Sequence, residues 1–272
     1  MSESINDILQ DFESYLKFYK KNYNYLIQKD ELKSDSVYEL DVDNGTDADS
    51  VKEEFKENYT SPITETVEIP MAKKTVKVVE NEDWKNAKNL LELKELIKDC
   101  KKCPLWKTRT SFVFGEGNPK ANLVVIGEAP GADEDEQGKP FVGRAGKLLT
   151  EILKAVDFTR EEVFICNILK SRPPNNRNPA PEEIEACEPY LFKQLELIKP
   201  KLILCVGTFA AQTLLRSKEP LGKMRGRFHE YQGIPTMVTF HPAALLRNPN
   251  WKRPTWEDVQ LLRKEYDKLV KK

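Results

Sequence analysis

The chain has 272 residues, with 43 Lys and Arg, 44 Asp and Glu, and a formal net charge of −1. It has no run of about 18 apolar residues, the minimum for a membrane-spanning helix. Its first residues, MSESINDILQ, lack the basic start and apolar core of a signal peptide. The sequence therefore excludes an integral membrane protein and predicts a cytoplasmic protein without a membrane partner.

The near-neutral total conceals an uneven distribution of charge. Residues 1–70 contain 17 acids and 7 bases, whereas residues 71–272 carry a net charge of +9. Such a basic body attracts polyanions and makes nucleic acid a candidate partner, with a solvated lysine-rich surface as the alternative. The five cysteines, without an export signal, are expected to be thiols or metal ligands and not a disulfide framework.

The chain divides into three predicted regions. Residues 1–28 contain apolar and aromatic side chains at helical spacing, which predicts an amphipathic helix that could bind an unidentified protein. Residues 29–81 are acidic and poor in aliphatic side chains, which predicts a disordered linker. Residues 82–272 are predicted to form the ordered domain, beginning with a helix in LLELKELIKDC, which ends at Cys100.

The predicted domain alternates short apolar runs with helical patterns. The runs at 122–127, 163–168, 201–207 and 236–240 are typical of strands buried on both faces. Helices are predicted at 144–156, 181–198, 208–215, with Thr208 as candidate N-cap, and 255–270. This order predicts a three-layer α/β/α sandwich with a central four-stranded parallel sheet, whose ligand binds beyond the carboxyl ends of the strands.

The segment VVIGEAPGADEDEQGKPFVGRAG, residues 124–146, combines five glycines with five carboxylates. The carboxylates argue against a phosphate site, since like charges repel. Cleavage of a glycosidic or N-glycosidic bond passes through a sugar that resembles a cation, which carboxylates stabilise. Glu128 and Glu134 are therefore candidate catalytic residues, and simple solvation of an exposed loop is the alternative.

Two further residues could bind a planar base. Phe141 could stack on it from the pocket rim, although a core position would also suit this side chain. Asn167 closes the second predicted strand, where its amide offers both a donor and an acceptor, as the edge of a pyrimidine requires. A turn-forming asparagine is the alternative.

The segment FHPAALLRNP, residues 240–249, places a histidine at the end of the last predicted strand. His241 could donate a proton to a developing anion on a leaving base, and a structural histidine is the alternative. Leu245 or Leu246 could wedge into a base stack, and Arg247 could bind a phosphate. His229, the other histidine, is interpreted as structural.

The segment SRPPNNRNPAPEE, residues 171–183, is rigid, polar and basic. It could present Arg172 or Arg177 to DNA phosphates, and an ordinary long loop is the alternative.

The cysteine spacing Cys100-Lys-Lys-Cys103 is compatible with a redox dithiol or with half of a zinc or iron–sulfur site. A metal centre needs further thiolates, and Cys187 is available on the 181–198 helix. Cys166 and Cys205 lie inside predicted strands, where buried packing is their expected role.

From about Leu91 to Leu269 the chain resembles the family 4, iron–sulfur type, uracil-DNA glycosylases of the uracil-DNA glycosylase superfamily. The resemblance rests on six motifs in order: C-x-x-C, FGEGNP at 114–119, GEAPG with ED and PFVGRAG, a strand ending in Asn, RPPNNRNP, and FHPAALLR. It implies a monomeric enzyme that flips uracil out of DNA and hydrolyses its N-glycosidic bond. A glycosylase for hypoxanthine or xanthine and a non-catalytic iron–sulfur DNA-binding module are the alternatives.

The resemblance also implies roles for individual residues. Glu128, Glu134 and His241 would be catalytic, and Ala129, Phe141 and Asn167 would bind uracil. The 240–249 segment would enter the gap left by the flipped base.

The resemblance further implies a [4Fe–4S] cluster, held by Cys100, Cys103 and Cys187. The family's cluster commonly uses a third cysteine just before RPP, and Ser171 occupies that position here, which leaves one of the four ligand positions without a cysteine. Three outcomes remain open. Ser171 or water completes the cluster, or Cys166 or Cys205 is the fourth ligand instead, or the site is empty and packing alone holds the segment.

Overall fold

The computed structural model describes residues 82–270. The predicted N-terminal helix, residues 1–28, and the predicted linker, residues 29–81, lie outside the described residues. No helix within residues 82–270 is long and apolar enough to cross a membrane.

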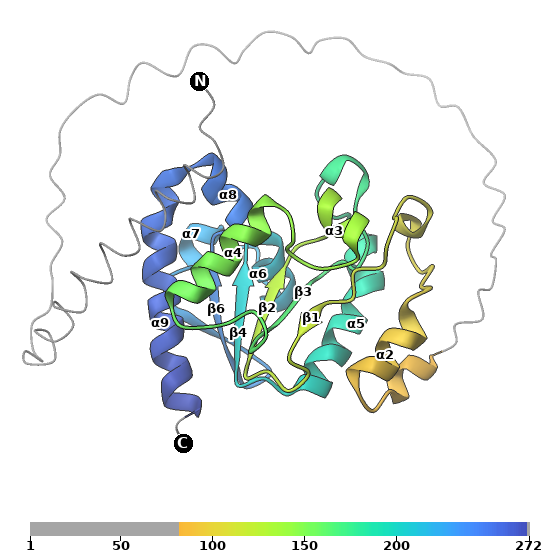
Figure 1. The fold of residues 1–272 in the computed structure, drawn as a ribbon, viewed down its shortest axis with the longest axis horizontal. Helices are drawn as coiled ribbons and strands as arrows, with labels where there is room; N and C mark the ends of the chain where they lie inside the picture. The colour runs from red at the N-terminus through yellow and green to blue at the C-terminus, as the bar shows by residue number, and fades with distance from the viewer. Residues whose placement is uncertain (1–81, 271–272) are drawn as a thin grey trace, which may run out of the picture. The chain divides into compact units, whose positions relative to one another are not determined.

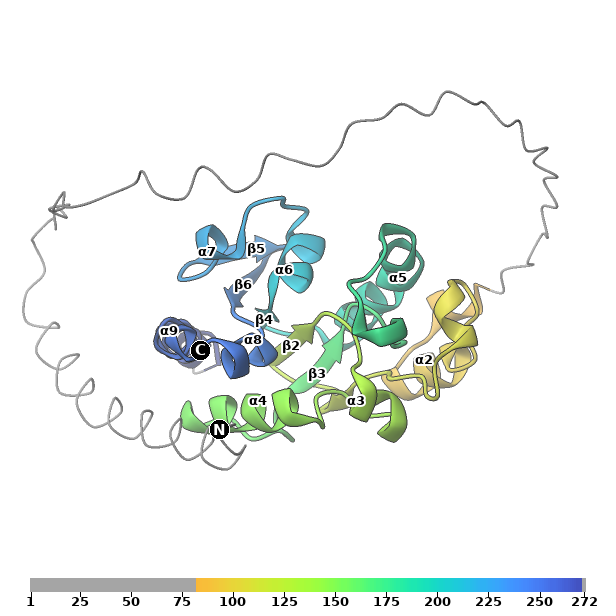
Figure 2. The same ribbon diagram turned by 90° about the horizontal axis from the view of Figure 1, so that it is seen from above.

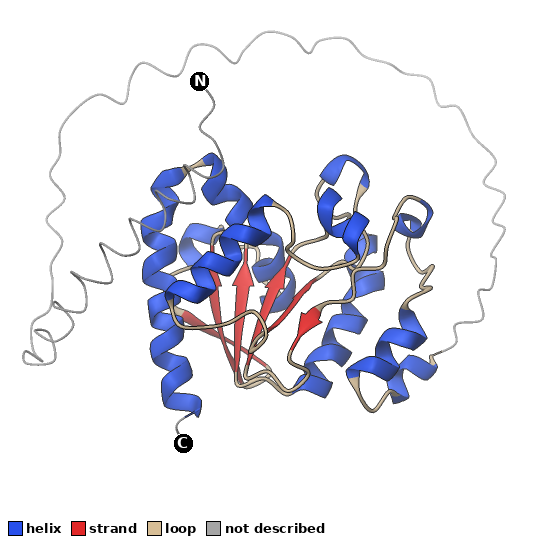
Figure 3. Cartoon of the chain, viewed as in Figure 1, coloured by secondary structure: helices blue, strands red, loops and turns tan. Residues whose placement is uncertain are grey.

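Six strands form a single sheet in the order β1-β3-β2-β4-β6-β5. The four central strands, β2 (Leu123–Gly127), β3 (Phe164–Asn167), β4 (Leu202–Val206) and β6 (Ile234–Thr239), are parallel, which confirms the predicted sheet. Two antiparallel edge strands, β1 (Glu116–Gly117) and β5 (Phe228–Tyr231), extend it on either side (Figure 3). Neither edge strand was among the four predicted strands, because both are short and half-polar and lack the continuous apolar run of a buried strand.

Helices cover both faces of the sheet, as Figures 1 and 2 show. On one face lie α2 (Leu90–Ile97), α5 (Pro181–Ile198), α6 (Thr208–Leu215) and α7 (Leu221–Met224), packed on strand residues such as Ile126. On the other face lie α4 (Arg144–Ala155), α8 (Pro242–Arg247) and α9 (Lys252–Val270), packed on alternate residues such as Val125. Successive strand residues point to opposite faces, so each buried strand supplies both cores of the predicted three-layer sandwich.

Single-turn 3₁₀ helices complete the connections: η1 (Asp83–Asn86), η2 (Pro104–Lys107), η3 (Pro174–Asn176) and η4 (Pro249–Trp251). Each except η1 has a proline at its first turn, where the missing N–H has no helical partner to lose.

The glycine-rich acidic segment contains a helix that was predicted as a loop. Ala132–Gln137 form α3, with Asp133, Glu134 and Asp135 in its first turn. Carboxylates are favourable there because the N-terminus is the positive end of the helix dipole. Buried Asp135 accepts hydrogen bonds from the backbone N–H of Thr110 and Ser111, at 3.0 and 3.2 Å. The solvated-loop alternative is therefore wrong for Asp135.

The predicted range of α6, 208–215, is confirmed, but its predicted N-cap is wrong by one residue. Gly207, not Thr208, is the N-cap, and its φ of 97° lies in the left-handed region that favours glycine. A Cβ at this position would lie 3.0 Å from the Cβ of His241, so the glycine also allows these two strand ends to approach closely.

Candidate active site

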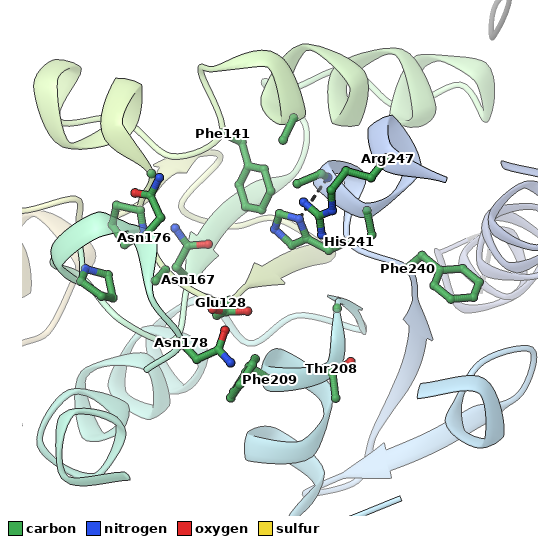
Figure 4. A pocket seen from close by; sticks show the side chains of 18 of the residues that line it. Glu128, Phe141, Asn167, Asn176, Asn178, Thr208, Phe209, Phe240, His241 and Arg247 are labelled. Carbon is green, nitrogen blue, oxygen red and sulfur yellow. Dashed lines mark hydrogen bonds between the residues drawn. The ribbon is translucent and has the colours of Figure 1, made fainter. Parts of the chain in front are cut away.

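A cavity of about 900 Å³ opens at the carboxyl ends of the four parallel strands (Figure 4). Its wall includes Glu128 after β2, Asn167 at the end of β3, Gly207 after β4 and His241 after β6. The parallel register aligns these ends, for example by pairing Gly127 with Asn167 and Val206 with Thr239. The structure thus brings together the polar strand ends that the sequence singled out.

Asn167 and Phe141 form one corner of the cavity. Asn167 is 2% exposed, and its Oδ1 atom has no hydrogen-bond partner among the described residues. A Cβ on Gly127 would overlap both the Phe141 ring and this amide oxygen, so only glycine lets the two groups meet over the end of β2. An unpaired buried acceptor costs about 1–3 kcal/mol, which marks this corner as a place for a ligand with a donor.

Phe141 has a left-handed backbone, with φ of 52°, which is costly for a bulky side chain. Glu134 holds this turn. Its Oε1 accepts hydrogen bonds from the backbone N–H of Val142 and Gly143, both at 2.9 Å, and its Oε2 accepts one from Gly131 at 3.1 Å. The carboxylate of Glu134 is thereby occupied by backbone donors, and it fixes the aromatic corner of the cavity.

Arg160 supports the same turn from outside the cavity. Its guanidinium donates hydrogen bonds to the carbonyl oxygen of Pro140 and, at 3.3 Å, to the Thr150 hydroxyl.

Glu128 lines the cavity as Glu134 does, and Figure 4 shows its carboxylate among the lining side chains. The side chain is partly buried, and this burial raises the pKa of Glu128 above its ordinary value of 4.5. A carboxylate in such a low-dielectric site interacts strongly with any positive charge that develops nearby.

His241 faces the Phe141 ring, with ring centroids 5.6 Å apart and an interplanar angle of 32°. It is the N-cap of α8, and its Nδ1 accepts a hydrogen bond from the backbone N–H of Ala243 at 3.1 Å. This bond assigns the proton to Nε2 in the neutral ring. Burial, assisted by the nearby charge of Arg247, lowers the pKa of His241 to about 4. His241 is therefore a neutral donor near pH 7.

The predicted DNA-binding leucines separate in the structure. Leu245 is 0% exposed and belongs to the core beneath α8, so its prediction as a wedge is wrong for this conformation. Leu246, one residue on, is partly exposed. Successive helix residues differ by about 100° in direction, and the helix phase therefore decides which leucine faces the core.

The predicted arginines also differ in their surroundings. Arg247 is exposed and lines the cavity. Arg177 lines it too, but binds Glu183 through two hydrogen bonds, at 2.9 and 2.6 Å. Arg172 lies outside the lining and donates from Nε to Asn176 Oδ1 at 2.7 Å. His229 bonds the Met224 carbonyl oxygen at 2.7 Å, consistent with its predicted structural role.

Several lining residues were not predicted from the sequence. They lie in or next to the 171–183 segment, the 240–249 segment or the end of β4: Asn176, Asn178, Thr208, Phe209, Phe240 and Trp251. Only their proximity in sequence to a candidate residue could have identified them, because none of these residue types indicates a catalytic role by itself.

The predicted cluster ligands converge from separate elements. Cys100 follows α2, Cys103 precedes η2, and buried Cys187 lies on α5, all within one core. Cys187 Sγ accepts from the backbone N–H of Lys170 at 3.2 Å, and Cys100 Sγ accepts from Tyr190 Oη at 3.3 Å. Burial raises the pKa of Cys187 to about 12, and the neighbouring charges of Cys100 and Cys103 add to this shift.

No group of three His, Cys, Asp or Glu side chains in the described part of the chain could hold one metal ion. A four-iron cluster takes one protein ligand at each iron, so its thiolates surround a much larger group. Cys100, Cys103 and Cys187 share one core, as three ligands of such a cluster would have to. Ser171 follows Lys170, and its Oγ accepts a hydrogen bond from Arg109 Nη1 at 3.0 Å. As the fourth ligand, Ser171 would supply an oxygen in place of a thiolate.

The fold and cavity together define an α/β protein with a cavity at the carboxyl ends of a parallel sheet, where proteins of this class bind their ligands. The chain belongs to the uracil DNA glycosylase superfamily, whose family model matches residues 114–260, and this confirms the resemblance predicted from its motifs. It is similar to the type-4 uracil-DNA glycosylase of Archaeoglobus fulgidus, with 45% identity over 184 residues, covering 65% of this chain and 87% of the relative. The type-4 uracil-DNA glycosylase of Pyrobaculum aerophilum is 48% identical over 183 residues, covering 64% and 92%.

Proposed function

We propose that this protein excises uracil from DNA by hydrolysing the bond between the base and its deoxyribose. Family membership and several relatives named type-4 uracil-DNA glycosylase support this function. The observation that carries it within the site is the buried, unpaired Oδ1 of Asn167 beside the Phe141 ring. A planar base with an N–H donor on its edge suits this corner.

In the proposed complex the uracil ring stacks on Phe141, and Asn167 reads its edge. The amide oxygen of Asn167 accepts from the ring N–H, and the amide NH₂ donates to an adjacent carbonyl oxygen. Ala129, in the cavity wall beside Glu128, contacts the base.

His241 acts on the leaving base. As the N-glycosidic bond breaks, negative charge develops on the uracil ring, and a positioned donor stabilises it. The neutral imidazole supplies that donor at Nε2, because Nδ1 is held by the Ala243 N–H. With a pKa of about 4, His241 needs no protonation to act in this way.

Glu128 acts on the sugar. Its carboxylate stabilises the deoxyribose as it becomes cationic, and it orients the attacking water. Because burial raises the pKa of Glu128, we expect activity to fall on acidification sooner than an ordinary glutamate would allow. Glu134, predicted to be catalytic, is assigned a positioning role here, since its oxygens bind the backbone around Phe141.

The target base must leave the duplex to reach this cavity. We assign Leu246 to the gap in the base stack, and Arg247 and Arg177, which both line the cavity, to the phosphates. We assign Arg172, which lies outside the cavity lining, to the DNA backbone next to the cavity.

We also propose that Cys100, Cys103, Cys187 and the oxygen of Ser171 hold a [4Fe–4S] cluster. The convergence of the three thiols and the similarity to type-4 enzymes support this assignment. When bound, the cluster would cross-link the residues after α2 to α5 and to the start of the 171–183 segment. Cys166 and Cys205 are excluded from the proposed set because both pair in register with Ile126 inside the sheet.

The proposed compartment is the cytoplasm, and the proposed state is a monomer. Five cysteines without a disulfide suit a reducing environment. The partner proposed for residues 1–28 is a further protein.

A labelled duplex with a single uracil tests the function. Incubation should make the strand alkali-labile at that site, and no cleavage at enzyme excess, on single- or double-stranded substrate, would overturn the proposal. Competition with duplexes containing hypoxanthine or xanthine tests base choice. Glu128→Gln should lose cleavage and keep DNA binding, whereas an unchanged cleavage rate would remove Glu128 from the mechanism.

A further inference from the structure

We propose that Trp251, stacked on Phe240, is a second base-binding subsite, which takes a nucleobase of the DNA strand outside the uracil corner. This inference rests on the proposed function, since it extends the same cavity to a neighbouring nucleotide. The chemistry assigned to Glu128, Asn167 and His241 makes no use of either aromatic ring.

The two rings form a well-aligned stack. Their centroids lie 4.6 Å apart, and their planes differ by 11°. The guanidinium of Arg225 lies over the Phe240 ring, 5.7 Å from its centroid. Because Trp251 already covers one face of Phe240, the guanidinium belongs to the other, and the order of the stack is Arg225, Phe240, Trp251.

A buried ion pair fixes this stack in place. Arg225 donates two hydrogen bonds to Asp258, at 3.0 and 2.8 Å, and one to the Pro254 carbonyl oxygen at 2.6 Å. Asp258 is 0% exposed and also accepts from the Thr239 hydroxyl at 2.6 Å. Thr239 ends β6 directly before Phe240, so the ion pair ties the stack to the strand that carries His241.

The backbone of Trp251 is held as firmly as its ring. Its N–H donates to the Asn248 carbonyl at 3.2 Å, and its carbonyl accepts from the Thr255 hydroxyl at 2.8 Å. A platform that is rigid before binding loses little entropy when a ligand stacks on it.

The end of the stack is open to the cavity. Trp251 lines the cavity with Arg247 and Phe240, yet it is 38% exposed. A single pyrimidine fills only a small part of about 900 Å³, so space remains for the neighbouring nucleotide. An exposed indole at the end of an aromatic stack, beside an arginine suited to phosphate, has the chemistry of a base-stacking platform in proteins that bind single strands.

The test uses the full chain and an oligonucleotide duplex in which an abasic analogue replaces the target nucleotide. Dissociation constants are measured by fluorescence anisotropy for the wild type, Trp251→Ala, Trp251→Phe and Trp106→Ala. Trp251→Ala should weaken binding about tenfold, the effect of one lost stacking contact, and Trp251→Phe should restore most of it. Trp106, 39% exposed on η2 and outside the cavity lining, is the matched control and should bind as wild type.

Fluorescent 2-aminopurine beside the abasic analogue, on either side, locates the contact. Its emission should be quenched by the wild type and much less by Trp251→Ala. The same quenching in both proteins, or equal dissociation constants for Trp251→Ala and Trp106→Ala, would overturn the subsite. If Trp251→Ala unfolds, Trp251→Leu keeps the apolar contact with Phe240 without a ring and gives the same comparison.

The abasic analogue carries no base to release, so the binding measurement is independent of uracil release. A wild type that binds through Trp251 but never releases uracil would count against the proposed function and leave the subsite standing.

Discussion

His241 makes protein stability depend on pH at the level of one side chain. Its pKa is about 4 in the folded chain and about 6.5 in an unfolded one, so the unfolded state binds a proton first as the pH falls. The contribution of the neutral His241 to the free energy of unfolding is complete above pH 6.5 and is lost as the pH falls from 6.5 to about 4. From pH 7 to 5 the loss should be about 2 kcal/mol.

Urea unfolding at the two pH values measures this effect. His241→Asn should show a smaller drop in the free energy of unfolding than the wild type, with His229→Asn as the comparison outside the cavity. Equal drops in the wild type and His241→Asn would contradict a buried neutral imidazole.

Asn167 is the residue at which base recognition can be tested most directly. Asn167→Ala removes both the acceptor and the donor proposed to read the uracil edge, so kcat/KM for uracil release should fall about 100-fold or more. Single-turnover kinetics on a uracil duplex measures it. Asn176→Ala is the control, because Asn176 lines the same cavity but is exposed and accepts from Arg172. Similar losses in both variants would argue against specific reading by Asn167.

At the scale of elements, buried Lys170 links α5 to the carboxyl end of β3. It is 0% exposed, and its Nζ donates to the Asn167 carbonyl oxygen at 2.7 Å and to Gln194 Oε1 at 2.6 Å. Lys170→Met has a similar length but leaves both oxygens unpaired, so the free energy of unfolding should fall by about 1–3 kcal/mol. Lys98→Met is the control, since Lys98 pairs with Glu95 at the surface, and its loss should lower the free energy of unfolding much less. Equal effects in urea unfolding would refute the link.

The cluster gives a second prediction for the elements around α5. Ser171→Cys should supply a fourth thiolate next to the Lys170 N–H, and iron retention after anaerobic purification should rise. Iron and sulfide content and the brown colour measure it. Ser217→Cys adds a thiol elsewhere and should change nothing. Colourless, iron-free wild type that is folded and active would rule the cluster out and leave the glycosylase assignment intact.

The parallel strands and long helices could be predicted because their burial is written into local composition. Strands covered on both faces have continuous apolar runs, and α5 and α6 match their predicted ranges. The short helices α3 and α8 were not predicted, since six residues are too few for a periodic pattern to emerge.

The candidate site was predictable to the extent that its residues end strands, as Glu128, Asn167 and His241 do. The clamp of Glu134 on the turn at Phe141 was not, because it depends on a left-handed backbone and on donors from both sides of α3. The same limit applies to Trp251, which meets Phe240 only through the path of α8 and η4.

For the whole molecule, the charge distribution predicts how DNA affinity responds to salt. Residues 71–272 carry the positive excess, so the dissociation constant should rise about tenfold or more between 50 and 200 mM salt. Removing residues 1–70, with 17 acids and 7 bases, should not weaken binding. Anisotropy titrations of both proteins measure this, and loss of binding on truncation would place residues 1–70 in the DNA site.

The strand order also determines when during synthesis the cavity can exist. The sheet grows outward from β2, as β3 is added on one side, then β4 and finally β6 on the other. A nascent chain that has reached residue 200 can pair Gly127 with Asn167, but it has no His241. His241 is therefore synthesised after both residues of the base-reading corner, and because domains generally fold as units, the cavity is complete only once the chain has passed β6.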